Sequence, residues 1–183
     1  MREETKKWIL NYVRDVIEKY TNFRKVEIPE EYPEELNEKR GVFVTLKKNG
    51  MLRGCMGIPY PVYPLIRALT ESAKSATEDP RFPILGPDEL EDVEIEVTVL
   101  TKPELIEVKN PEEYPEKIEI GKDGLIIEAG YYSGLLLPQV PVEQGWGPEE
   151  FLSHLCLKAG LDRDFWRKRR CRIYKFQGEI ISE

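Results

Sequence analysis

Residues 52–57 combine a reactive side chain with an unusual backbone, because Cys55 lies between two glycines and two residues after Arg53. A nearby cation favours the thiolate, which is the nucleophilic form of cysteine. Gly54 and Gly57 carry no side chain, so a substrate could approach the backbone there. We therefore predict Cys55 and Arg53 as catalytic residues, with Gly54 and Gly57 as substrate contacts.

A purely structural role is the alternative for Cys55, since free cysteines are among the most buried residue types. His154, the only histidine, lies two residues from Cys156 on a predicted helix, where positions i and i+2 face different directions. A pairing of Cys55 with His154 stays open, because it depends on the fold. One histidine and three scattered cysteines show no zinc-ligand spacing, and the glycines form no nucleotide fingerprint. The sequence thus predicts no metal site and no cofactor.

Two further segments place polar side chains in apolar or proline-rich surroundings, which suggests a cleft lined by both. One follows the predicted second helix, and the other follows an apolar strand and precedes a Gly-Trp pair. The alternative is that these side chains satisfy the backbone of ordered loops. We predict six substrate-binding residues in these segments: Glu78, Asp79, Arg81, Gln139, Glu143 and Gln144.

The charge balance argues against broad binding to nucleic acid or to an anionic membrane. The chain has 27 basic and 34 acidic residues, a formal net charge of −7. Both of those partners reward a positive surface. Residues 167–172 form a local basic run that could contact phosphate, although cations are also favoured at the end of a helix.

Strands and helices alternate along the chain. Asn49-Gly50 favours a hairpin with a type I′ turn between residues 42–46 and the strand that contains Cys55. Helical spacing of apolar residues predicts helices over about residues 3–20, 65–77 and 148–160. Residues 93–99 alternate apolar and polar side chains, which is typical of a strand with one buried face.

Short connections predict an antiparallel meander over 118–120, 125–127 and 133–138, because parallel crossovers need longer segments. Together these elements indicate an α+β fold, an antiparallel β-sheet with helices packed on it. At 183 residues we expect a single domain, 1–183, with at most a minor second lobe.

Composition also points to a cellular location. Three cysteines without a CxxC pair fit a reducing compartment. The charged N-terminus precedes no signal-peptide core, and no apolar run reaches membrane length. We expect a soluble, cytoplasmic protein, and its 33% charged residues, rich in Glu and Lys, would suit a thermophile.

Four motifs in order resemble the AMMECR-domain family, which is named for a human chromosomal region linked to Alport syndrome, midface hypoplasia and elliptocytosis. They cover nearly the whole chain and comprise residues 52–57, 76–83, 136–140 and 143–146. Met56 departs mildly from the family, which usually has Ile there. Residues 151–156 resemble the prokaryotic branch.

The resemblance implies helices packed on an antiparallel sheet, a smaller accessory lobe, and a functional site at the Arg-Gly-Cys motif. The biochemical activity of the family is unsettled. Its prokaryotic members are often encoded or fused with a Memo-type protein and a radical SAM enzyme, which are therefore the implied partners.

We expect an intracellular enzyme or enzyme component that uses Cys55 as nucleophile or thiol carrier. The alternatives are a non-catalytic binding or scaffold module that presents the same motif surface, and a nucleic-acid or nucleotide-binding protein. The sequence specifies no oligomeric state.

Overall fold

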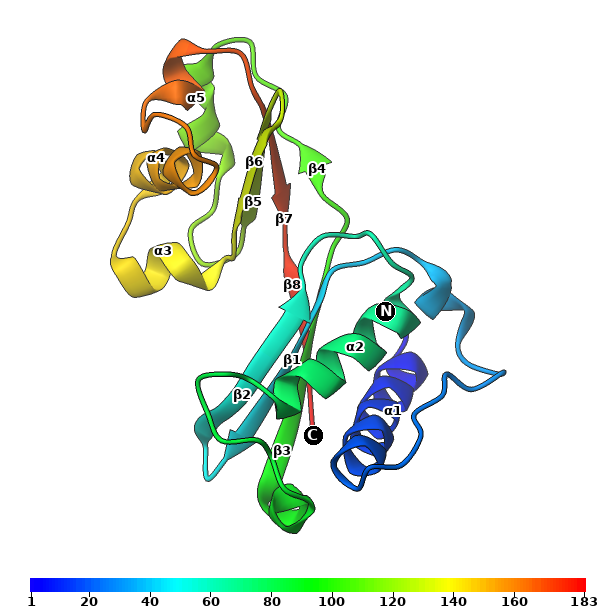
Figure 1. Cartoon of the computed structure of the whole chain (residues 1–183). Coiled ribbons are helices and arrows are strands. Elements are labelled where there is room, and N and C mark those ends of the chain that lie inside the picture. Colours follow the sequence, from blue (N-terminus) through cyan, green and yellow to red (C-terminus); the bar gives the residue numbers. More distant parts are fainter. The chain divides into compact units, whose positions relative to one another are not determined.

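A computed structural model describes all residues, 1–183, and divides them into two units (Figure 1). The first unit comprises Met1–Leu100 and Glu179–Glu183, and the second comprises Thr101–Gly178. Each unit has its own four-stranded sheet and its own buried core. The predicted α+β class, with helices packed on antiparallel sheet, is confirmed in both.

The sheet of the first unit has the strand order β2-β1-β3-β8. Its strands are β1 (Val42–Lys48), β2 (Met51–Ile58), β3 (Val93–Leu100) and β8 (Gly178–Ser182). Both β2 and β3 pair with β1 in antiparallel register. Asn49 and Gly50 both have positive φ, as a type I′ turn requires, so the predicted hairpin is confirmed. Strand β2, which carries Cys55, lies at the edge of the sheet.

Helices α1 (Glu3–Thr21) and α2 (Leu65–Thr77) cover one face of this sheet (Figure 1). Their buried side chains pack against alternate residues of the strands, among them Val44, Leu46 and Ile95. This pattern follows from the two-residue repeat of a strand, which turns every second side chain toward the helices. Short 3-10 helices, η1 (Glu34–Asn37) and η2 (Pro87–Asp92), complete the unit.

The second unit has a sheet of order β4-β7-β5-β6. Its strands are β4 (Glu104–Leu105), β5 (Gly124–Ala129), β6 (Tyr132–Leu136) and β7 (Arg172–Phe176). Its helices are η3 (Pro111–Lys117), α3 (Gln139–Gln144), α4 (Pro148–Lys158) and α5 (Phe165–Lys168). Phe151, Leu152 and Leu155 on α4 pack into a core shared with β5 and β7.

The predicted strand at 118–120 is wrong, although the hairpin β5–β6 is as expected. The Glu119 N–H donates to the Asp123 carboxylate at 2.9 Å, and the Asp123 N–H donates to the Glu119 carbonyl at 3.0 Å. These bonds close a turn in place of a strand. The free side of β5 is taken by β7, so no ladder position remains for this segment.

Gly54 allows the last turn of α2 to contact β2 directly. Its Cα faces the helix, and a Cβ built at this position would overlap the carbonyl oxygen of Ala76. The space at Gly54 therefore admits the α2 backbone, where the sequence predicted a substrate.

We expect Gly54→Ala to lower the free energy of unfolding by about 1–3 kcal/mol, because backbone cannot yield to the added methyl group. Urea denaturation followed by circular dichroism measures the change. Gly147→Ala is the control, since a Cβ at Gly147 meets no atom within 4 Å and its φ of −81° suits any residue. Its one expected cost, below about 1 kcal/mol, is that alanine is a weaker N-cap of α4 than glycine. Equal stability of the two variants would contradict this account of the helix contact.

Candidate functional site

Cys55 lies on the face of the first sheet opposite α1 and α2, which we call the open face. It pairs with Thr45 of β1, which is flanked by the buried core residues Val44 and Leu46 and so faces the other way. The Cys55 side chain is half-buried. Its sulfur is 3.2 Å from the Thr45 hydroxyl oxygen, within hydrogen-bond distance.

A β-bulge in β2 produces this pairing. Lys47 pairs with Leu52, but Leu46 pairs with Gly54, so Arg53 has no partner across the ladder. Without the extra residue, the two-residue turn would pair Thr45 with Gly54. The bulge therefore brings the thiol and the Thr45 hydroxyl together on the open face.

Asp79 fixes the backbone of Cys55 from the turn that follows α2. Its side chain is buried, with 2% of the residue exposed, and its Oδ2 accepts the Cys55 N–H at 2.9 Å. That N–H therefore points away from β1, past the edge of the sheet. Thr45 and Cys55 are thus a non-hydrogen-bonded pair, the type of antiparallel pair whose side chains lie closest. Asp79 also accepts the Arg81 backbone N–H at 3.0 Å.

The guanidinium of Arg81 makes a two-pronged ion pair with the same carboxylate. Nε and Nη2 donate to the two Asp79 oxygens at 3.0 and 2.7 Å. Arg81, followed by the Cys55 and Arg81 N–H groups, keeps the pKa of Asp79 well below its ordinary value despite the burial. Asp79 is therefore a charged carboxylate at neutral pH.

Arg81 also brings positive charge to Cys55. Its Nη2 donates to the Cys55 carbonyl oxygen at 3.4 Å. The pKa of Arg81 is raised, mainly by its hydrogen bonds to Asp79 and by the charge of that carboxylate. More than half of the Arg81 side chain, 58%, is exposed, and its Nη1 has no hydrogen-bond partner in the chain.

Arg53 points to a different partner. Its Nε and Nη2 donate to the Glu89 carboxylate at 3.1 and 2.9 Å, and its Nη1 donates to the Pro83 carbonyl at 2.9 Å. It makes no hydrogen bond to the Cys55 thiol. Arg53 thus ties the 83–89 segment to β2, and the cation that interacts with Cys55 is Arg81.

The other predicted residues of this unit lie around the same strand edge. Gly57 leaves room for the ring of Phe43, which a Cβ at that position would overlap. Phe43 is half-buried on the open face, two pairs along the ladder from Thr45. Glu78 is exposed and accepts a hydrogen bond from the Tyr20 hydroxyl at 3.0 Å.

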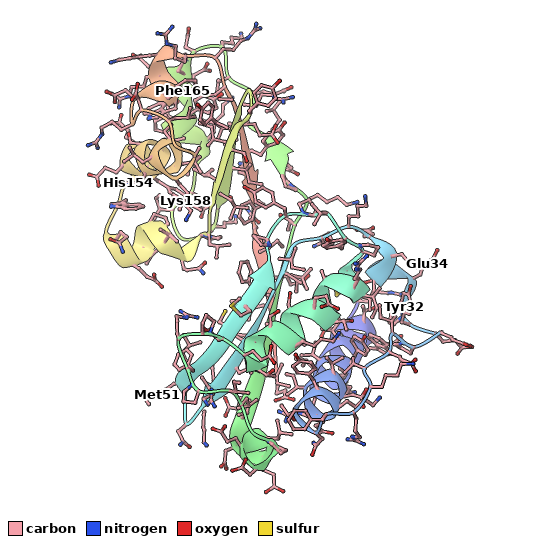
Figure 2. All side chains as sticks on the ribbon, viewed as in Figure 1. Tyr32, Glu34, Met51, His154, Lys158 and Phe165 are labelled. Carbon is pink, nitrogen blue, oxygen red and sulfur yellow. The ribbon has the colours of Figure 1, made fainter.

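Three predicted residues belong to the second unit. Gln139, Glu143 and Gln144 lie on α3, are exposed, and make no side-chain hydrogen bond within the chain. His154 lies on α4 (Figure 2), where its ring stacks on Trp146 with centroids 3.7 Å apart and planes 3° from parallel. The motif at 143–146 therefore ends in an aromatic stack.

Burial disfavours the thiolate form of the other two cysteines, Cys156 and Cys171. Burial raises the pKa of Cys156 to about 11, and burial also raises the pKa of Cys171. Both thiols are therefore neutral at pH 7, which leaves them poor nucleophiles.

Most of the basic run at 167–172 is paired with acids. Arg167 bonds to Glu149 at 2.9 Å and Arg172 to Glu128 at 3.2 Å. Lys168 lies 3.8 Å from Asp164. This pairing weakens the case for a phosphate-binding surface there. No three His, Cys, Asp or Glu side chains are grouped to hold a metal ion, and no helix has the length and apolarity to span a membrane.

Sequence reasoning missed Thr45, Glu89 and Phe43. Thr45 and Phe43 could be identified only from the pairing of β1 with β2. The two-residue turn alone predicts a pairing that is wrong by one residue, because the sequence gives no sign of the bulge. Glu89 pairs with Arg53 across 36 residues of sequence, and only the fold brings them together.

Comparison with known proteins gives one consistent result. A family model described as AMMECR1 matches residues 10–181. Protein MJ0810 of Methanocaldococcus jannaschii is 56% identical over 177 residues, which cover 95% of this chain and 88% of that protein. Protein NEQ441 of Nanoarchaeum equitans is 54% identical over 172 residues, covering 93% and 96%. The crystal structure of uncharacterized protein PH0010 from Pyrococcus horikoshii is similar with a TM-score of 0.81 and 47% identity, covering 100% of this chain and 93% of that chain.

The Arg53–Glu89 pair predicts a pH-dependent contribution to stability. Arg53, the Gly86 N–H and Lys48 lower the pKa of Glu89 from 4.5 to about 2. A lowered pKa means that folding favours the charged form, so this stabilisation is complete above about pH 4.5 and is lost as the pH falls to about 2. We expect Glu89→Gln to lower the free energy of unfolding by about 1–2 kcal/mol at pH 7, with the deficit shrinking between pH 4.5 and 2.

Urea denaturation at several pH values measures that deficit. Glu91→Gln is the control, because the exposed Glu91 side chain makes no hydrogen bond or ion pair. A deficit that stays constant across the acid range would show that Glu89 contributes through packing and not through its charge.

Proposed function

This chain belongs to the AMMECR1 family, and from that premise we propose that it is an intracellular enzyme or enzyme component in which Cys55 reacts with an anionic substrate. Cys55 acts as nucleophile or thiol carrier. The observation that carries the proposal is the half-buried Cys55 thiol beside the Thr45 hydroxyl, with the exposed Arg81 guanidinium bonded to the carbonyl oxygen of the same cysteine.

Arg81 is the group that binds the anion. Its Nη1 is free, and the buried carboxylate of Asp79 holds the guanidinium in place, so little side-chain entropy is lost when an anion binds. Asp79 acts as a positioning residue, since it touches the Cys55 backbone and Arg81 but not the sulfur. Arg53 supports the same arrangement through the 83–89 segment.

The reaction starts from the thiolate. Its sulfur donates an electron pair to an electrophilic atom of the substrate, and the leaving group departs with the electron pair of the broken bond. The thiol proton goes to water, and the Thr45 hydroxyl donates a hydrogen bond to the charged sulfur before the attack.

The remaining predicted contacts are part of the proposal. Gly57 lies in the strand that carries Cys55, and Glu78 directly follows α2. Gly54 allows the same strand to pack closely against α2. Gln139, Glu143 and Gln144 on α3 of the second unit are polar contacts for a ligand or a partner of that unit, and their lack of internal hydrogen bonds supports such a role. Memo-type and radical SAM proteins are the proposed partners, on the strength of family resemblance.

A charge-selective labelling experiment tests the proposal. Iodoacetate and iodoacetamide both form a carbon–sulfur bond to Cys55 and release iodide, but only iodoacetate is an anion. We expect the rate with iodoacetate divided by the rate with iodoacetamide to be about tenfold higher at Cys55 than at the thiol of free glutathione. A factor of ten corresponds to one charge-assisted hydrogen bond. Mass spectrometry of the labelled peptides gives both rates.

Arg81→Gln should abolish the excess, and Cys55→Ser should remove the label. Arg67→Gln is the matched control. Arg67 is an exposed cation of α2 that lies over the ring of Tyr63, and it makes no hydrogen bond to Cys55. A wild-type ratio equal to that of glutathione would contradict the enzyme proposal and favour the alternative, a binding module that presents the same surface.

A further inference from the structure

Phe23 follows the C-terminus of α1 in a conformation that aromatic residues rarely adopt. Its φ is +56°, in the left-handed region. The Phe23 N–H donates to the Tyr20 carbonyl and the Arg24 N–H donates to the Lys19 carbonyl, which is the Schellman arrangement. Glycine is the usual residue at this position, since a side chain there carries a conformational cost.

The Phe23 side chain makes no compensating contact within the chain that would hide it from water. It is 98% exposed, and the nearby Ile84 is 74% exposed. Between them lies a groove of about 460 Å³, whose apolar walls include Tyr20, Leu85 and Pro87. An exposed aromatic side chain, which we call the knob, thus lies beside an apolar groove. Both its positive φ and its exposure to water are unfavourable in the isolated chain.

The charges around the groove are opposite and are not paired with each other. The Arg24 side chain makes no hydrogen bond or ion pair, and the Glu78 carboxylate is bonded only to the Tyr20 hydroxyl. Both residues line the groove. A two-fold rotation would bring each knob to the other copy's groove and each cation to the other copy's carboxylate, because such an interface uses the same patch on both subunits.

We propose that a second copy of this chain docks here, with Phe23 of each copy in the groove of the other and Arg24 facing Glu78 across the axis. A buried aromatic side chain covers about 150–250 Å². Two such rings with their neighbours fall short of the roughly 1,200 Å² of a standard interface. The dimer is therefore weak and forms reversibly, with a dissociation constant on the order of 100 µM. This inference does not depend on the chemistry of Cys55.

Sedimentation equilibrium of the full chain between about 10 µM and 1 mM tests the proposal, with a monomer–dimer equilibrium expected in that range. Phe23→Gly should weaken association at least tenfold, and its melting temperature should be unchanged or higher because glycine relieves the positive φ. Tyr131→Ser is the matched control, since Tyr131 is as exposed as Phe23 but belongs to the second unit.

Charge reversal separates self-docking from other occupants of the groove. Arg24→Glu and Glu78→Arg should each weaken association, and the double variant should restore it, because only a second copy carries both changes. A monomer at all concentrations, or association that survives Phe23→Gly, would overturn the proposal. So would a double variant that remains as weak as the single ones.

Discussion

The arrangement around Cys55 depends on the buried carboxylate of Asp79. A charge removed from water is costly unless it is fully paired, and Asp79 accepts hydrogen bonds from the Cys55 N–H, the Arg81 N–H and two guanidinium nitrogens. These bonds join an edge strand to the turn after α2. They also occupy the Cys55 N–H, which would otherwise be open to another strand. The same four contacts therefore satisfy the charge, protect the edge and orient Arg81.

A second ion pair extends this connection along β2. Arg53 bonds to Glu89 and to the Pro83 carbonyl, while Lys48 reaches the same carboxylate at 3.2 Å. The segment between α2 and β3 is thus attached to the edge strand at two places. Because both carboxylates have lowered pKa values, both attachments are charged at neutral pH. An exposed guanidinium and a half-buried thiol then lie on a surface with little freedom to rearrange.

Local patterns in the sequence predicted the α+β class, the long helices, the Asn49-Gly50 hairpin and the alternating strand at 93–99. They also identified several residues that lie near Cys55 in the first unit, because glycines in a strand and acids next to a proline can be recognised from the sequence alone. They did not tell which arginine interacts with Cys55. Arg53 is two residues away in sequence, but Glu89, 36 residues away, binds its guanidinium. Pairings of this range depend on the packing of α2 and η2, which no local pattern encodes.

The bulge at Arg53 decides which of two neighbouring residues is available for chemistry. Because successive residues of a strand face opposite ways, a slip by one position would turn Gly54 outward and place the sulfur under α2. A chain with every residue type retained could thus bury the Cys55 thiol through backbone geometry alone. Preservation of the Arg-Gly-Cys motif in a relative is therefore insufficient for shared chemistry unless the spacing from the hairpin tip is preserved with it.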